Sequence, residues 1–450
     1  MSVNHSATGT VETPDPELVA RVVSAVEERR GLILDFFRDL VRIPSETHPP
    51  GGDEGPAQGF VAERMRAIGL QPDVFEPWSV PDIEQHPGWW PGLDYSDRPN
   101  VVGVWRGSGS GRSLILNGHI DVVPAGDRTL WRHDPYGAEM EDGLIYGRGT
   151  ADQKIGIAAM LMAVQTLSDL GLRPGGDVTV ESVVNEELGG YNGTLACCAK
   201  GYRADAAIVT EATDFAVGGA QKGGQVYRMV VPGEAYHHAV WERGASALDH
   251  AILLKEALVE WERLRQDETR TDFYYGDGAR ALHPRAVHAD TVWYLQAGDP
   301  AIMANPTSAE LRFWVDHLPG EDREEMLRRF EEHVLAKAAR HPYLKDHPPL
   351  LERAVMRPFT GVAVAPDAPL VRTLRAVSRA VLGRDVPVVG LEAATDAMIF
   401  NLYSETPAVI YCGGTFSVAH APDEHVSADD VITSTSALAL AILQFCGTSR

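Results

Sequence analysis

The sequence predicts an α/β protein: a domain with a central mixed sheet flanked by helices, and a smaller α+β domain inserted into it. Three observations support this fold class. Short apolar strands alternate with helices from residue 60 to residue 241, a pattern typical of a mostly parallel or mixed sheet with helices on both faces. The pattern changes in the middle of the chain and resumes near residue 358. The length of 450 residues fits two domains better than one.

The larger domain is expected to occupy residues 14–218 and 358–450. Pro14 and Asp15 open its first helix, and Pro44 ends it. The stretch Trp78–Pro99, rich in Pro, Gly and Trp, is expected to be a long surface excursion. Apolar periodicity predicts the other elements, which are helices at Phe60–Ile68, Asp152–Leu170, Leu195–Lys200, Pro369–Leu382 and Ala428–Phe445 and strands at Asn100–Trp105, Ser113–Leu116, Asp177–Val184, Ala206–Val209 and Ala408–Cys412.

The inserted domain is expected to span residues 219–357. Alternating apolar and polar residues predict half-exposed strands, and apolar stripes at helical spacing predict amphipathic helices. A few strands with two long helices are typical of a small α+β domain. The segments are strands at Gln225–Val231, Thr291–Gln296 and Ala309–Val315 and helices at Ala247–Leu264 and Glu321–Ala339.

Charge and composition exclude several classes of function. The 40 basic and 63 acidic residues give a net charge of −23, which argues against nucleic acid or an anionic membrane as a partner. No apolar run approaches the roughly 18 residues of a membrane helix. The N-terminal segment lacks the basic start and apolar core of a secretory signal and is expected to be a frayed tail. The four cysteines form no disulfide framework, so we expect a cytoplasmic protein.

Polar residues follow several predicted strands or begin predicted helices. The strand that ends at Leu116 runs through Asn117 and Gly118 into His119 and Asp121. A nearby carboxylate can orient the ring of a metal-binding histidine, but such a pair is also common in purely structural roles. Asp152 follows a glycine-rich turn at a helix start, where it could cap the helix or bridge two cations. Each feature alone leaves both interpretations open.

The later strand ends add further candidate ligands. Glu186 and Glu187 follow one strand, and adjacent carboxylates repel each other unless a cation or a shared proton intervenes. One of them can bind a metal while the other faces substrate as a base; a solvated acidic turn is the alternative. Glu211 and His420 follow two more strands. Mixed imidazole and carboxylate ligands suit zinc, cobalt or manganese, and five ligands with one bridging carboxylate suit a two-metal hydrolytic site.

These segments resemble the motifs of the M20 family of metallopeptidases and amidohydrolases. The family includes acetylornithine deacetylase, succinyl-diaminopimelate desuccinylase, aminoacylases and a glutamate carboxypeptidase. The resemblance implies a catalytic α/β domain with an inserted lid domain that commonly dimerises. It covers nearly the whole chain and rests on motifs in the family's order and spacing: LNGHIDVVP (Leu116–Pro124), YGRGTADQK (Tyr146–Lys154), NEELGG (Asn185–Gly190), TEATD (Thr210–Asp214) and AHAPDEHV (Ala419–Val426).

The resemblance also implies a role for each candidate ligand. His119 and Glu211 would hold one divalent metal ion, Glu187 and His420 would hold a second, and Asp152 would bridge the two. Zinc is the expected metal, with cobalt and manganese as alternatives.

Two neighbouring carboxylates would complete the catalytic group. Asp121 would orient the ring of His119. Glu186 would be the general base that takes a proton from the metal-bridging water.

The lid domain supplies three more candidates. His237 ends a G-x-x-x-H motif and would stabilise the oxyanion, in its own site or in a partner subunit's; an ordinary surface histidine is the alternative. Asn305 would contact substrate. Asp316 stands where many relatives carry an arginine, so it would disfavour a substrate carboxylate if it faces the site. Alternatively, it lies on the solvent face of its strand, or Arg312 takes over the recognition of carboxylates.

The implied function is that of a di-metal hydrolase. It would cleave the amide C–N bond of a small N-acylated compound, N-acetyl, N-formyl or similar. The run Glu392–Asp396 and the residues near His420 favour the deacetylase and deformylase-like branch. A metallo-dipeptidase or carboxypeptidase with the same site is the close alternative, and a non-catalytic binding protein on this scaffold is the other. The expected partners are a small N-acyl substrate and a second copy of the chain, bound through the lid domain.

Overall fold

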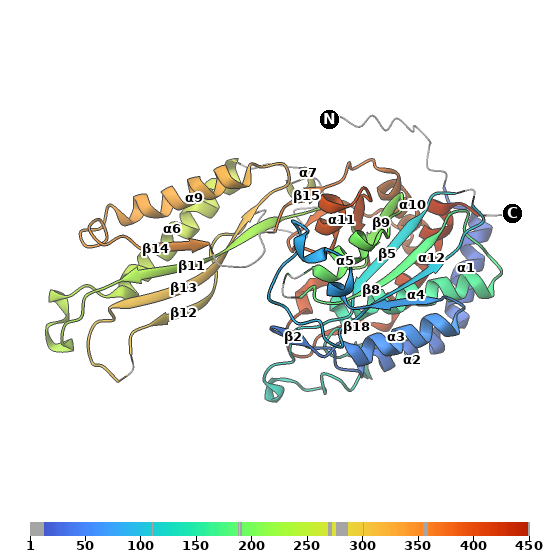
Figure 1. Cartoon of the computed structure of the whole chain (residues 1–450), viewed down its shortest axis with the longest axis horizontal. Coiled ribbons are helices and arrows are strands. Elements are labelled where there is room, and N and C mark those ends of the chain that lie inside the picture. The colour runs from blue at the N-terminus through green and yellow to red at the C-terminus, as the bar shows by residue number, and fades with distance from the viewer. Residues whose placement is uncertain are drawn as a thin grey trace. The chain divides into compact units, whose positions relative to one another are not determined.

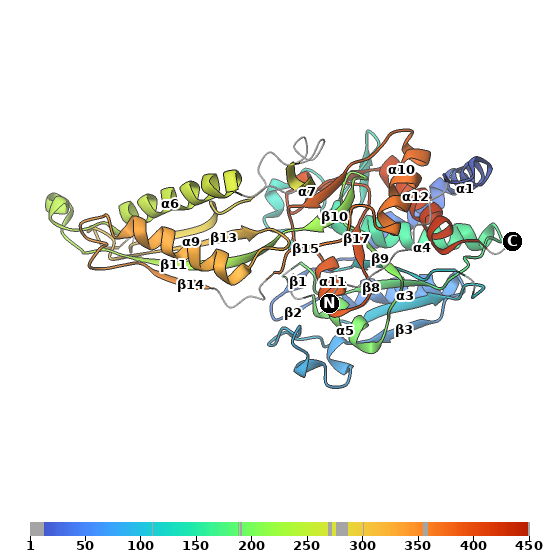
Figure 2. The same ribbon diagram turned by 90° about the horizontal axis from the view of Figure 1, so that it is seen from above.

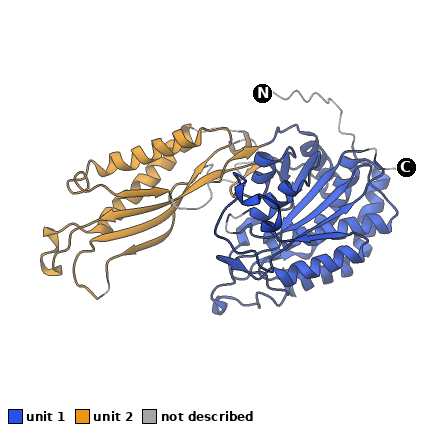
Figure 3. Cartoon of the chain, viewed as in Figure 1, with its two compact units in different colours: residues 1–219, 364–389, 395–450 blue, residues 220–363, 390–394 orange. Residues whose placement is uncertain are grey.

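The computed structural model describes residues 13–109, 111–187, 189, 191–268, 272–275, 287–299, 301–353 and 359–448 (Figure 1). The predicted boundary between residues 357 and 358 lies outside these residues, as do the N-terminal tail up to residue 12 and Leu188 and Gly190 of the NEELGG motif. The chain forms two compact units, and the second is inserted into the first (Figure 3). Unit 1 is Met1–Gly219, Val364–Val389 and Thr395–Arg450, and unit 2 is Ala220–Ala363 and Gly390–Ala394.

Unit 1 is built on a mixed sheet in which seven strands follow the order β10-β17-β9-β5-β8-β4-β3, and β16 also pairs with β10. The four strands β17, β9, β5 and β8 run parallel, while β10, β4 and β3 are antiparallel to their neighbours. The predicted mixed sheet is therefore confirmed. The strands are β3 (Pro72–Phe75), β4 (Asn100–Trp105), β5 (Leu114–His119), β8 (Val178–Val183), β9 (Ala206–Val209), β10 (Val217–Gln221), β16 (Val388–Leu391) and β17 (Ala408–Ile410).

Helices cover both faces of this sheet. α4 and α12 pack against each other on one face, whereas α5 and α11 lie together on the other (Figure 2). α12 is the one described helix long and apolar enough to span a membrane, but 78% of its apolar window is buried, so it serves as a core helix. The helices are α1 (Pro16–Glu28), α2 (Arg30–Val41), α3 (Gly55–Ala67), α4 (Ile155–Asp169), α5 (Asn192–Lys200), α10 (Pro369–Leu382), α11 (Ala397–Tyr403) and α12 (Ala428–Cys446).

Unit 1 also contains smaller elements outside the main sheet. A second, three-stranded sheet has the order β18-β7-β6, and the turn η4 leads directly into α4. These elements are β1 (Thr47–His48), β2 (Gly51–Gly52), β6 (Glu139–Glu141), β7 (Leu144–Tyr146), β18 (His425–Ser427), η1 (Pro77–Ser79), η2 (Ile83–Gln85), η3 (Arg128–Leu130), η4 (Thr150–Lys154) and η6 (Phe416–Val418).

Two predictions for unit 1 need correction. The single helix expected before Pro44 is two helices, because Arg29 leaves the helical region with φ −98° and ψ 8°. Buried residues of both helices belong to one core, so the apolar pattern continues across the break and conceals it. The stretch Trp78–Pro99 is more than a surface excursion, since Tyr95 and Arg98 within it are fully buried.

Unit 2 is an antiparallel sheet with two long helices packed on it. The strand order is β12-β13-β11-β14, and the core between sheet and helices includes Tyr227 stacked on Phe313, with ring centroids 5.6 Å apart. This confirms the inserted α+β domain. Its elements are β11 (Gly223–Pro232), β12 (Thr291–Ala297), β13 (Ser308–His317), β14 (Leu350–Arg353), β15 (Val362–Ala363), η5 (His238–Arg243), α6 (Ala247–Glu268), α7 (Asp272–Tyr275) and α9 (Arg323–Ala338).

Candidate metal centre

The candidate ligands lie at one edge of the unit 1 sheet. His119 is the last residue of β5, Glu186 and Glu187 follow β8, Glu211 follows β9, and His420 lies in the segment after β17. These four strands are neighbours and run parallel, so their carboxyl ends meet. Functional groups in open α/β sheets collect at this edge.

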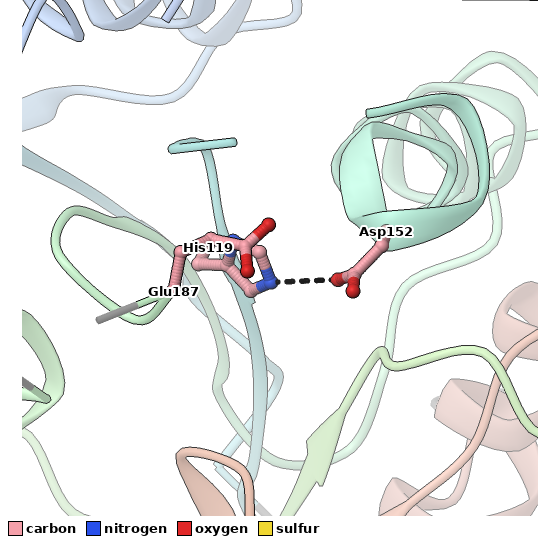
Figure 4. Close-up of side chains that lie close together, drawn as sticks. All are labelled: His119, Asp152 and Glu187. Carbon is pink, nitrogen blue, oxygen red and sulfur yellow. Dashed lines mark hydrogen bonds and ion pairs between the residues drawn. The ribbon is translucent and has the colours of Figure 1, made fainter. Parts of the chain in front are cut away.

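Asp152 lies between the two histidines. It belongs to η4, where its φ of −124° and ψ of 91° are not helical. Its Oδ1 is 3.1 Å from His119 Nε2 (Figure 4), and its Oδ2 is 3.4 Å from His420 Nε2. His420 Nε2 is also 2.8 Å from Glu187 Oε2. Each oxygen of the Asp152 carboxylate therefore faces a different histidine, as expected of a ligand that bridges two metal ions.

The side chains fit a bound cation. One ligand atom each from His119, Asp152 and Glu187 lies within 4.8 Å of the other two. Glu211 is buried, and neither of its carboxylate oxygens accepts a hydrogen bond from the described residues, although Oε1 is 3.3 Å from His119 Nε2. A buried carboxylate without hydrogen bonds is costly unless a positive charge compensates it. Imidazole nitrogens and carboxylate oxygens are ligands that zinc and similar divalent metals prefer.

The pKa shifts reflect the crowding of acidic groups. Burial, with repulsion from Asp152, raises the pKa of Glu187 and of Glu211 to about 7. Hydrogen bonds to Asp152 and Glu187 raise the pKa of His420 to about 10. Burial opposes a charge on His119, yet nearby carboxylates, Glu211 foremost, raise its pKa well above the ordinary value. Such a cluster needs positive charge among its carboxylates, from protons or from metal ions.

Glu186 is placed beside this ligand group without a close contact to it. Its Oε2 is 4.0 Å from His119 Nε2, and the residue is buried. Burial raises the pKa of Glu186 well above the ordinary value, and the neighbouring Glu211 carboxylate adds to the shift. A carboxyl group with a raised pKa next to a ligand cluster is suited to accept and release a proton.

Asp121 was predicted to orient the ring of His119, and in the structure it contacts that ring mainly through its main chain. The His119 ring bonds through Nδ1 to the backbone carbonyl of Asp121 at 2.8 Å, while the nearer carboxylate oxygen is 3.6 Å away. The Asp121 carboxylate instead accepts the backbone N–H groups of Glu186 and Glu187, both at 3.1 Å. The main chain of Asp121 therefore orients the histidine, and its side chain holds the turn that carries the two glutamates.

The predicted lid residues belong to unit 2. His237 is exposed, and its Nδ1 accepts the N–H of Ala239 at 3.2 Å. Asn305 is half-buried and donates from Nδ2 to the carbonyl of Trp241 at 2.8 Å, so it joins two loops of unit 2. The roles of His237 and Asn305 toward an oxyanion and a substrate stay predictions.

The structure corrects the alternative that Asp316 lies on the solvent face of its strand, whereas its role toward a substrate stays a prediction. The residue is 3% exposed within unit 2 and accepts hydrogen bonds from Lys222 Nζ at 3.2 Å and the His288 N–H at 2.8 Å. Burial opposes its charge, but His288 and Lys222 lower the pKa of its carboxyl group. The carboxylate is therefore satisfied inside unit 2. Arg312 is likewise engaged, donating to Glu310 at 2.9 Å.

Sequence reasoning missed two residues that support the site, Tyr95 and Glu424. Tyr95 donates its hydroxyl to Asn185, the residue before Glu186, at 2.6 Å. Glu424 belongs to the AHAPDEHV motif but received no role. Glu424 could have been predicted to support the site, because it is an ionisable residue inside a motif. Tyr95 could not, because nothing in the local sequence connects it with residue 185.

The α/β unit with an inserted α+β unit and the imidazole and carboxylate donors are those expected of a metal-dependent hydrolase. The profile of peptidase family M20/M25/M40 matches residues 115–444, and the chain belongs to this family.

Two curated relatives are similar over different lengths. The N-formyl-4-amino-5-aminomethyl-2-methylpyrimidine deformylase of Halalkalibacterium halodurans is 28% identical, and the alignment covers 95% of this chain and 98% of the relative. The succinyl-diaminopimelate desuccinylase of Methylocella silvestris is 32% identical over 50% of this chain and 55% of the relative.

Solved structures share the fold at low sequence identity. Human carnosine dipeptidase 1 has a TM-score of 0.71 at 14% identity, with 96% of this chain and 99% of that chain covered. An M20 family metallo-carboxypeptidase of Sulfolobus solfataricus has a TM-score of 0.66 at 16% identity, with 92% and 98% covered.

Proposed function

We propose that the protein is a metal-dependent amidohydrolase that removes a small acyl group from the nitrogen of a low-molecular-weight amine. The observation that carries this proposal is the position of Asp152 between His119 and His420, with the buried Glu186 alongside. Two relatives that align over nearly their whole length are named deformylases of an N-formyl aminopyrimidine. We therefore take an N-formyl amine as the first candidate substrate and N-acetyl and N-succinyl amines as the next.

We further propose two divalent metal ions, with zinc as the first candidate. His119 and Glu211 would hold one ion, Glu187 and His420 the other, and Asp152 would contribute one oxygen to each. Bound there, the ions would polarise the scissile carbonyl and lower the pKa of water.

The residues of the chain would supply the proton transfers. Glu186 would accept a proton from the attacking water and later donate it to the nitrogen of the leaving amine. The Asp121 carboxylate holds the backbone N–H of Glu186 and so fixes where this proton is taken up. Burial keeps Glu186 able to carry the proton between the two steps, because it stabilises the protonated form.

The experiment compares Glu186→Gln with Glu63→Gln, a matched change at an exposed position of α3. After zinc, cobalt or manganese loading, parent and variants are assayed with N-formyl, N-acetyl and N-succinyl amines and with dipeptides. We expect Glu186→Gln to keep its metal content and unfolding midpoint but to lose about 10²–10⁴-fold in kcat. Glu63→Gln should match the parent.

Three outcomes would count against the proposal. Near-parental turnover in Glu186→Gln would assign the base to another residue. Cleavage of dipeptides alone would favour the peptidase alternative. A metal-loaded parent chain that hydrolyses none of these compounds would favour a binding protein.

We also propose that unit 2 joins two copies of the chain. β12 pairs with β13 along one edge and with no second strand among the described residues. Trp293 and Leu295 on this strand are 54% and 49% exposed. An exposed apolar edge strand favours pairing with another chain, and a second copy is the partner that is always present.

A further inference from the structure

We infer that Glu424 is a positioning residue that fixes the turn bearing Asp152 relative to the segment bearing His420. The inference rests on the proposed metal centre, because Asp152 would be the ligand that both ions share. Glu424 itself would touch neither metal nor substrate; it would act only through the backbone of Asp152.

The side chain of Glu424 is directed entirely at the turn that carries Asp152. The residue is fully buried. Its Oε1 accepts the backbone N–H groups of Ala151 at 2.9 Å and of Asp152 at 3.1 Å, and its Oε2 accepts Arg148 Nη1 at 2.6 Å. One carboxylate thus holds three donors within the segment from residue 148 to residue 152.

The backbone around Glu424 is attached to the same turn. Its carbonyl accepts the N–H of Gly147 at 2.8 Å, and the next residue begins β18, where His425 pairs with Tyr146. On the other side, the Asp423 carboxylate accepts the backbone N–H of Arg132 at 2.8 Å. The short segment from His420 to Glu424 is therefore held at its end beside the Asp152 turn.

This arrangement links ligands that are far apart in the sequence. His420 precedes Glu424 by four residues, and Asp152 is held by the Glu424 carboxylate itself. The two ligand side chains face each other, with His420 Nε2 3.4 Å from Asp152 Oδ2. Because the Asp152 backbone is not helical, its N–H has no helical partner that could replace the Glu424 oxygen. Loss of that oxygen would let the turn move relative to His420.

A general stabilising role for a buried ion pair with Arg148 is the competing explanation. Unit 2 offers a comparable case, the partly exposed Glu321, whose carboxylate accepts Arg265 Nη2 and the backbone N–H of Leu318, the latter at 2.7 Å. Both carboxylates hold an arginine and backbone N–H, but all five proposed metal ligands belong to unit 1. Comparing Glu424→Ala with Glu321→Ala therefore separates positioning from general stability.

The experiment measures metal binding by the full-length chain. Zinc affinity is determined by competition with a chelator, and the visible absorption of the cobalt-loaded protein reports the ligand geometry. We expect Glu424→Ala, which removes the oxygen that accepts the Ala151 and Asp152 N–H groups, to weaken zinc binding about 10–100-fold, the usual cost of losing a group that supports a ligand, and to change the cobalt spectrum. Glu321→Ala should keep the affinity and spectrum of the parent.

Arg148→Lys provides a second variant, since it leaves Glu424 Oε1 free to hold Ala151 and Asp152. It should bind zinc within about threefold of the parent. If Glu424→Ala does not fold, Glu424→Asp takes its place, because the shorter side chain withdraws the carboxylate from the Ala151 and Asp152 N–H groups but keeps its charge. Parental affinity in the folded Glu424 variant, or an equal loss in Glu321→Ala or Arg148→Lys, would overturn the role of Glu424. A parent chain that binds no metal would instead overturn the proposed metal centre.

Discussion

At the scale of single residues, the position of Asp152 predicts how much metal the protein loses when one ligand is replaced. It would supply one oxygen to each of two ions, whereas His119 would ligate only one. Asp152→Ala should therefore lose nearly all bound metal, and His119→Ala should keep about half. Elemental analysis of both variants after zinc loading checks this. Equal metal content in the two variants would show that Asp152 is not shared.

Glu181 predicts how stability depends on pH. It is fully buried in the middle of β8, where Oε2 accepts Asn117 Nδ2 at 3.0 Å. Burial raises the pKa of Glu181 to about 8 from an ordinary value of 4.5. Between these values the folded chain holds a proton that the unfolded chain has released, so the contribution of Glu181 to stability falls as pH rises.

Glu181→Gln should remove this contribution. Chelator-treated parent and variant are unfolded in denaturant at pH 5, 6, 7 and 8. As pH rises, the free energy of unfolding of the variant should increase relative to that of the parent, by up to about 1.4 kcal/mol for each pH unit. The candidate ligands titrate alike in both proteins, so the difference isolates Glu181. Parallel stability curves would contradict the raised pKa.

At the scale of elements, the stretch Trp78–Pro99 is predicted to support the turn that carries Glu186. The Tyr95 hydroxyl donates to Asn185 Oδ1 at 2.6 Å, and Asn185 has the left-handed φ of 67° directly before Glu186. Tyr95→Phe removes this hydrogen bond and should lower stability by about 1–3 kcal/mol. It should also lower kcat several-fold with little change in KM, because only the placement of the base is disturbed.

Tyr202→Phe is the matched control, since that hydroxyl donates to Asp73 Oδ2 at 2.5 Å within the same unit. It should lose stability but keep the parental kcat. If Tyr202→Phe slowed turnover as much as Tyr95→Phe, the effect would be one of general stability. Steady-state kinetics and denaturant unfolding of both variants separate the two explanations.

The elements also explain what could be predicted from the sequence. His119, Glu187 and Glu211 were predicted to lie together because each follows a strand, and parallel strands bring their carboxyl ends to one edge. The partners of Asp316 were not predictable, because Lys222 and His288 are distant in sequence and carry no motif. Side-chain contacts of this kind depend on register and packing, which local periodicity does not encode.

At the scale of the whole molecule, the net charge of −23 bears on the proposed dimer. Two chains with this charge repel each other. Salt weakens that repulsion, because charges further apart than about 10 Å are largely screened from each other at 0.1 M ionic strength. An association that relies on the apolar edge at β12 should therefore strengthen as salt rises from low to moderate concentration. Contacts made mainly of ion pairs would weaken instead.

The test of the dimer is Leu295→Lys on β12, compared with Leu130→Lys in unit 1, where Leu130 is 63% exposed. Both changes place a cation at an exposed leucine, and both reduce the net negative charge by the same amount, so general repulsion should ease equally. Sedimentation velocity at several salt concentrations should find the parent and Leu130→Lys as dimers. Leu295→Lys should be monomeric, because a charge on an edge strand opposes pairing. A parent that sediments as a monomer at every salt concentration would exclude the dimer, and a dimeric Leu295→Lys would move the interface away from β12.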